Sequence, residues 1–296
     1  MKTKHLILSG TVLMIAATIA FTGCRKKDDP KDNDTSGAED NSLADKYFED
    51  MGQISNEAAS GSVNSYKNAG YDGMLSHCTN VTHDTANNLI TVDFGSVNCL
   101  CHDGRYRRGK IFVSYTGNSY WDSLASVTIS TSKTGDPSSN TYFVGNDANS
   151  MHQIIGTKTI TNKGHNGAGH MNWDISVSGQ IIKPNSQGTI TWTSARNREW
   201  LAGESTPIIW SDDIYGVTGS ANGTSANGTP FTVQITSQLI RKLDISCIRW
   251  FTAGTLDFTP GSKPVRHVDF SPPNNGACDN IATVTINNNT YTVQMK

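Results

Sequence analysis

Apolar and polar residues alternate with a period of two along most of the chain after Leu89. The alternation is cleanest in residues 173–178, 188–193, 231–236 and 291–295. Successive side chains of a strand point to opposite faces of a sheet. This period is therefore typical of antiparallel strands that have one face in water.

Turn-forming sequences separate the alternating runs. They are Gly135-Asp136-Pro137, Pro184-Asn185, Asn222-Gly223, Asn227-Gly228 and the three asparagines at 287–289. No alternation of strands and helices, as a parallel sheet would need, is visible in the sequence. We therefore predict an all-β fold over residues 75–296, a large antiparallel meander of roughly a dozen strands or more. Because sheets of this size curl or split, a half-open barrel and a sandwich are both compatible with the pattern.

A helical period occurs in residues 43–59. Its apolar residues recur every three or four positions: Leu43, Tyr47, Met51 and Ile54, with Phe48 beside them. This spacing predicts one short N-terminal helix whose apolar stripe packs on the sheet. The helix and a linker then occupy residues 43–74.

The N-terminus carries a secretory pattern, in which Lys2 and Lys4 precede an apolar stretch at 6–21. A membrane-spanning helix needs roughly 20 apolar residues, so the shorter stretch favours a cleaved signal peptide at 1–23. Gly23 directly precedes Cys24, and this order resembles a bacterial lipoprotein signal. The resemblance implies that Cys24 becomes the first mature residue and carries lipid, including palmitate. An ordinary signal peptidase site nearby is the alternative.

The residues after Cys24 predict the address of the protein. Lys27-Asp28-Asp29 resembles the signal of one lysine and two acids that sends Bacteroidota lipoproteins to the cell surface. A generic charged tether is the alternative. Residues 25–42 are nearly all charged, polar, Gly or Pro, so we predict a flexible tether over 24–42. The predicted location is the outer membrane, with the lipid-anchored domain facing the cell exterior.

The charge balance excludes one class of partner. The chain has 24 Lys and Arg and 26 Asp and Glu. Removal of residues 1–23 takes away Lys2 and Lys4 and no acid, which leaves 22 basic residues and a net charge of −4. This is not the balance of a nucleic-acid-binding protein.

The two ends of the predicted sheet share an order of residues. It runs Cys78, Val92-Asp93-Phe94-Gly95, Cys99 at the start, and Cys247, Val268-Asp269-Phe270-Ser271, Cys278 at the end. A strand follows each unit, at 110–115 and 282–286. The order indicates an internal repeat, either a duplication or two equivalent hairpins at opposite ends of one sheet.

The repeat predicts two disulfides, Cys78–Cys99 and Cys247–Cys278, in a chain whose export places it where disulfides persist. Each closes a loop of roughly 20 to 30 residues and adds about 3 kcal/mol in the loop-entropy model. Cys101 is then left over. Cys78–Cys101 is an alternative pairing, because Cys99 and Cys101 lie on the same side of an extended strand.

The first unit of the repeat also carries a family resemblance. Asp93-Phe94-Gly95 precedes Cys99, and the run Asp103-Gly104-Arg105-Tyr106-Arg107-Arg108-Gly109-Lys110 follows. This pattern resembles a family of uncharacterised Bacteroidota outer-membrane and surface lipoproteins, over about residues 75–296. The run here has one residue more between its arginines and its glycine. The resemblance implies a β domain in the cell envelope and brings no activity with it.

Aromatic and basic residues gather in one stretch of the predicted sheet. Trp200 and Trp210 lie close in sequence to Arg196 and Arg198. Sugars stack their C–H faces on exposed rings, so these four residues are candidates for a surface glycan-binding platform. Trp192 falls on the apolar phase of its strand and is predicted to be core.

The sequence predicts a lipid-anchored binding or structural protein of the cell surface and no enzymatic activity. Its partners are then the membrane, through the lipid, and a glycan or a surface protein. We predict no metal site and no cofactor besides the lipid on Cys24. A glycoside hydrolase is the less favoured alternative, with carboxylates drawn from Asp212-Asp213, Glu199 and Glu204.

Overall fold

The computed structural model describes residues 32–60, 73–206, 209, 211–244, 247–248, 250–271, 273 and 275–295. Residues Asn33–Lys296 form one compact unit. The predicted signal peptide lies outside the described residues. So do the predicted lipid site Cys24 and the export signal Lys27, Asp28 and Asp29.

Sixteen strands form one sheet in the described part of the chain. They are β1 (Asn80–Asp84), β2 (Leu89–Asp93), β3 (Cys99–Leu100), β4 (Tyr106–Arg108), β5 (Lys110–Tyr115), β6 (Ser126–Ser130), β7 (Phe143–Gly145), β8 (His152–His165), β9 (Met171–Ile182), β10 (Thr189–Ala202), β11 (Ile214–Thr224), β12 (Pro230–Lys242), β13 (Phe251–Pro260), β14 (Arg266–Asp269), β15 (Ile281–Ile286) and β16 (Asn289–Gln294). Two 3₁₀ turns, η2 (Pro137–Ser139) and η3 (Pro184–Ser186), join strands that are consecutive in the chain.

The strands are paired almost in chain order, as a meander requires. The order is β1-β2-β5-β6-β8-β9-β10-β11-β12-β13-β14-β15-β16, and the short strands β3, β4 and β7 pair beside this path. Every pairing is antiparallel. The predicted all-β antiparallel meander is confirmed, and its strands belong to one open sheet rather than to two packed layers.

One predicted turn is wrong. Asn222-Gly223 lies inside β11, whereas Pro184-Asn185 falls in η3 and Asn227-Gly228 forms the turn before β12. A Cβ on Gly223 would lie 1.9 Å from the carbonyl oxygen of Thr191 on β10. The glycine is therefore required for the close approach of two strands, not for a reversal of the chain.

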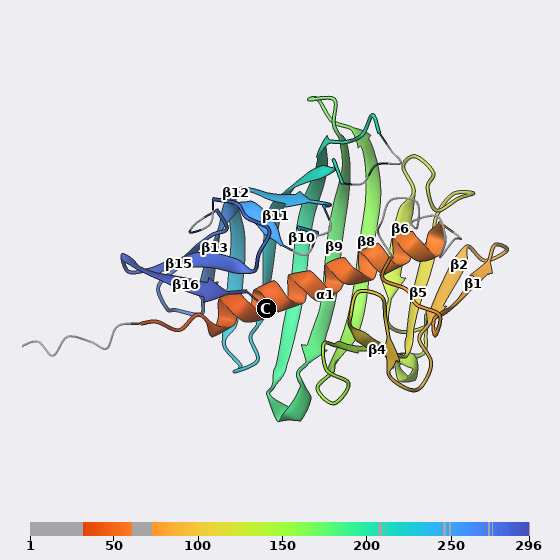
Figure 1. Ribbon diagram of the computed structural model, residues 1–296, viewed down its shortest axis with the longest axis horizontal. Helices are drawn as coiled ribbons and strands as arrows, with labels where there is room; N and C mark the ends of the chain where they lie inside the picture. Colours follow the sequence, from red (N-terminus) through yellow and green to blue (C-terminus); the bar gives the residue numbers. More distant parts are fainter. Residues whose placement is uncertain are drawn as a thin grey trace, which may run out of the picture. The chain divides into compact units, whose positions relative to one another are not determined.

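Helix α1 (Ser36–Ala59) runs across the strands on one face of the sheet (Figure 1). Its 24 residues span about 36 Å, and strands lie about 4.8 Å apart, so it crosses some seven strands. The predicted stripe of Leu43, Tyr47, Met51 and Ile54 is buried, as is Phe48, which stacks on Trp192 with ring centroids 5.7 Å apart. In the described part of the chain, no helix is long and apolar enough to cross a membrane.

The helix begins seven residues before its predicted start, so the prediction of a flexible tether is wrong for residues 36–42. Tertiary contacts hold this first part in place. Gly37 packs so closely under the Phe258 ring that a Cβ would lie 2.7 Å from it. The Asp40 carboxylate pairs with Lys183 and accepts a 2.8 Å hydrogen bond from the amide of Ala226. A polar composition alone did not reveal these contacts.

The internal repeat is visible in the geometry of the two hairpins β2–β5 and β14–β15. In each, the aspartate ends its strand with the same turn: Asp93 accepts a hydrogen bond from Gly95, and Asp269 accepts one from Ser271. The valine before each aspartate is fully buried. The two units therefore form equivalent hairpins near opposite ends of one sheet.

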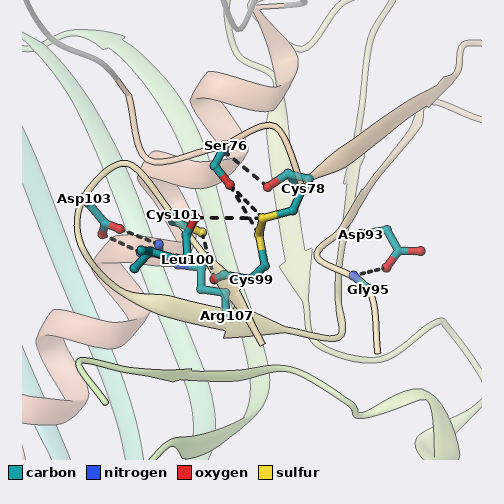
Figure 2. Close-up of a disulfide and its surroundings, with 10 residues drawn as sticks. Ser76, Cys78, Asp93, Gly95, Cys99, Leu100, Cys101, Asp103 and Arg107 are labelled. Atoms are coloured by element: carbon teal, nitrogen blue, oxygen red, sulfur yellow. Dashed lines mark hydrogen bonds and ion pairs between the residues drawn. A yellow bond between two sulfur atoms is a disulfide. The ribbon is translucent and has the colours of Figure 1, made fainter. Parts of the chain in front are cut away.

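Both predicted disulfides are present. Cys78 pairs with Cys99 and Cys247 with Cys278, across Cα–Cα distances of 6.0 and 4.4 Å. Figure 2 shows the first bridge beside Ser76, whose hydroxyl lies 3.0 Å from the Cys78 sulfur. Cys101 is a buried free thiol, so the alternative Cys78–Cys101 pairing is not formed.

We expect peptide mapping under non-reducing conditions to recover the Cys78–Cys99 and Cys247–Cys278 links and a free Cys101. Burial raises the pKa of the Cys101 thiol, so it should be alkylated slowly in the native protein and fully in denaturant. Removing the first bridge with Cys78→Ser and Cys99→Ser should lower the free energy of unfolding by about 3 kcal/mol. Cys101→Ser is the control and should leave both links intact; a Cys78–Cys101 peptide would contradict the pairing.

Candidate functional site

A cavity of about 100 Å³ lies between α1 and the face of the sheet that α1 covers. We call it the α1 pocket. Its charged lining residues come from the helix and from three strands: Asp45, Glu49, Glu57, Lys158, Arg196, Arg198 and Arg241. Apolar side chains, among them Phe48, Ile175, Val177, Trp192 and Val217, make up the other part of its wall.

The periods of the two kinds of element bring the charged groups together. Asp45 and Glu49 are four residues apart, so they lie on the same side of α1. On β10 the period of two places Ser194, Arg196 and Arg198 on the covered face, in line with buried Ile190 and Trp192. The strands two places away on either side of β10 add Lys158 from β8 and Arg241 from β12.

Glu49 is the centre of the ion pairs in the pocket. Its carboxylate lies 2.8 Å from Lys158 Nζ, 3.3 Å from Arg241 and 3.6 Å from Arg198. Burial alone would raise the pKa of Glu49, but these three cations outweigh it and hold that pKa well below its usual range. Glu49 is therefore ionised throughout the physiological range.

Arg196 is much less well paired. It is 8% exposed, and its contact to Asp45 is 4.0 Å, which is longer than a hydrogen bond. Asp45 also lies 3.5 Å from Arg241, so the two arginines share one carboxylate. Burial lowers the pKa of Arg196, an effect that Asp45 offsets only in part.

Unpartnered polar atoms concentrate in this pocket. Among the described residues, six buried side-chain nitrogen or oxygen atoms have no hydrogen-bond partner. Four of the six belong to the pocket lining: Ser194 Oγ and the Nε atoms of Arg196, Arg198 and Arg241. The α1 pocket is therefore the place where this fold leaves hydrogen-bonding capacity unused.

An aromatic cluster borders the pocket through Tyr215. The Arg198 guanidinium lies over the rings of Trp173 and Tyr215, at 4.9 and 5.1 Å from their centroids. Trp200 stacks on Tyr215 at 5.7 Å and donates a 3.1 Å hydrogen bond from its indole nitrogen to Asp213. These contacts hold Arg198 and Trp200 in place.

A wider groove of about 680 Å³ also borders α1, and three of its polar side chains are paired. The Tyr47 hydroxyl lies 3.0 Å from His152 Nδ1, and Lys183 pairs with Asp40. Burial, together with Lys183 and Lys46, lowers the pKa of His152 to about 4, so this ring is neutral at pH 7. The α1 pocket is the stronger candidate because four of its buried polar atoms lack partners.

The structure describes three of the four residues predicted for a glycan platform. Arg196 and Arg198 line the α1 pocket, where they are largely covered by the helix. Trp200 is half-buried in the aromatic cluster, with a neighbouring ring stacked on it. Trp210 lies outside the described residues.

The four carboxylates considered for glycoside hydrolysis all have polar partners. Glu199 lies on the opposite face of β10 from Arg198 and accepts hydrogen bonds from Asn166 and Gln238. Glu204 pairs with His165, and Asp213 contacts Trp200 on the covered face. Among the described residues, no three His, Cys, Asp or Glu side chains gather as metal ligands would.

Sequence reasoning missed Lys158, Arg241, Asp45 and Glu49. The sequence did contain a signal for Lys158. It lies between Ile154 and Ile160 among the alternate positions of β8 that face the core. A cation at such a position must meet an acid when the strand is covered. What covers it is a helix more than 100 residues away in the chain, and the pattern of the strand does not identify that partner.

No family model, curated protein or solved structure matches the chain. The function is therefore inferred from the geometry of its own residues.

The environment of Asp213 predicts that the free energy of unfolding depends on pH. Burial raises its pKa to about 6, and Asp212 adds to this rise. The folded state then holds this proton more tightly than the unfolded state, whose pKa is about 3.9. The resulting stabilisation is complete below about pH 4 and is lost as the pH rises through about 6.

Urea unfolding between these pH values measures the effect. Asp213→Asn should reduce the decrease in the free energy of unfolding across this pH range. Asp212→Asn, at the exposed neighbouring position, should retain most of that decrease. Equal slopes for wild type and Asp213→Asn would contradict the assignment.

Proposed function

We propose that this protein is a non-catalytic binding protein of the cell envelope, which receives a small ligand in the α1 pocket. The observation that carries the proposal is the set of four buried, unpartnered polar atoms in one cavity. Each such atom costs about 1–3 kcal/mol when it is left unsatisfied. Apolar side chains would form a more stable core, so the polar lining favours a role in binding.

The same lining supports a binding role over a catalytic one. Ser194 is a hydroxyl beside the cations, but no histidine is among the described residues that line the pocket. Glu49, which could act as a base elsewhere, is held ionised by three cations and has a lowered pKa. A carboxylate in this state is a poor proton acceptor.

The proposed location follows from the N-terminal sequence. A lipid on Cys24 and the surface signal Lys27-Asp28-Asp29 would hold the domain on the outer membrane, facing the medium. Two disulfides support this, because such bridges persist in exported proteins. The ligand would then come from outside the cell.

The ligand site is tested by filling the pocket. We expect a panel of small neutral and charged organic compounds to raise the melting temperature of the wild-type protein for at least one class. Ser194→Phe should abolish that shift, because the ring would occupy the cavity. Ala195→Phe, on the exposed face of the same strand, is the matched control and should retain it.

Two results would overturn the proposal: no compound binds the wild type, or Ser194→Phe binds as well as Ala195→Phe. Since Ser194→Phe introduces a large side chain, its unfolding must first be shown to remain cooperative. If Ser194→Phe does not unfold cooperatively, Val217→Phe, at a half-buried position of the same wall, is used in its place.

The location is tested by protease treatment of intact cells. We expect the wild-type domain to be degraded and the variant Lys27→Ala, Asp28→Ala, Asp29→Ala to be protected. Cys24→Ala should lose incorporation of labelled palmitate. Protection of both proteins would place the domain on the inner side of the outer membrane instead.

A further inference from the structure

The charges that line the α1 pocket do not cancel. Four cations, Lys158, Arg196, Arg198 and Arg241, face two carboxylates, Asp45 and Glu49. The third carboxylate of the lining, Glu57, accepts hydrogen bonds from the amides of Met74 and Leu75. Even with all three carboxylates ionised, one positive charge remains in excess.

The excess charge coincides with the unused donors. The Nε atoms of Arg196, Arg198 and Arg241 have no acceptor among the described residues, and Arg196 and Arg241 are 8% and 7% exposed. A guanidinium donates in a planar fork that matches the two oxygens of a carboxylate. One anionic group with two oxygens would satisfy donors that Asp45, shared between these two arginines, leaves unused.

The rest of the wall selects the other end of the ligand. Phe48, Ile175, Val177 and Trp192 present apolar surface to the same cavity. The cavity of about 100 Å³ is somewhat smaller than the apolar cavities of about 150 Å³ that hold benzene. A cavity of this size favours an organic acid with a short aliphatic chain over one with an aromatic ring, and its apolar wall favours such an acid over an inorganic ion.

We infer that the α1 pocket binds a small organic monocarboxylate, with its carboxylate between Arg196 and Arg241 and its apolar body against Phe48 and Trp192. This inference rests on the proposed function and adds the chemical class of the ligand. A single negative charge matches the single excess positive charge, and the Ser194 hydroxyl is a further donor on the same face of β10.

Propionate and propionamide test the inference, because they share a shape and differ in charge. We expect calorimetry and thermal shift to show propionate binding at least tenfold more tightly than propionamide, and more tightly than phosphate or sulfate. Arg196→Gln should weaken propionate binding at least tenfold. Lys163→Gln removes an exposed cation outside the pocket and should leave binding unchanged.

A variant that is expected to bind more tightly distinguishes a loss of binding from a loss of folding. Asp45→Asn removes the carboxylate that competes for Arg196 and Arg241, so it should tighten propionate binding. A folding defect would not strengthen binding. All variants are compared in buffers free of carboxylates and with equal chloride.

Each other outcome overturns the inference in a distinct way. Equal affinities for propionamide and propionate would show a ligand pocket that ignores charge, and the proposed function would stand. Equal affinities for phosphate and propionate would show that the apolar wall does not contribute to selectivity. If Arg196→Gln binds propionate as tightly as the wild type, the carboxylate does not bind at Arg196. If no compound of any charge binds, the proposed function fails as well.

Discussion

The structure depends on the burial of one polar helix against one face of an open sheet. Fifteen of the 24 residues of α1 are buried, and several of them are acids. Buried charges must be paired, so the sheet and its loops present a cation to each of four acids along the helix: Lys183 to Asp40, Arg241 to Asp45, Lys158 to Glu49 and Arg105 to Asp50. Buried ion pairs add little net stability, but a helix shifted along the sheet would leave all four unpaired. The row of pairs therefore specifies where α1 lies.

The α1 pocket is the place where this pairing is incomplete. At Asp40 and Asp50 each acid is paired with a cation of its own. Around Glu49 and Asp45 the strands supply more cations than the helix supplies acids, because β10 carries both Arg196 and Arg198 on its covered face. The binding site and the helix–sheet interface are thus parts of one arrangement of charge.

The sequence predicted most of what local periodicity controls. Alternation gave the strands of the meander, and the repeated Val-Asp-Phe units gave the hairpins and both disulfides. Prediction from the sequence failed where residues far away in the chain determine the local structure. The sequence of residues 36–42 predicted a tether, because their contacts with Phe258 and Ala226 cannot be seen in it. Arg196 was singled out for an exposed platform, because nothing in β10 shows that a helix covers it.

The position of α1 in the chain has a consequence for how the protein matures. The helix comes first in sequence, yet Asp40 bonds to Ala226, 186 residues later, and the carbonyl of Asp34 meets Arg266, 232 residues later. Contacts of such long range are slow to form. A chain that emerges N-terminus first therefore exposes an amphipathic segment until strands near its other end arrive. During that interval the segment is open to chaperones and to premature association, and its acids help to keep it soluble.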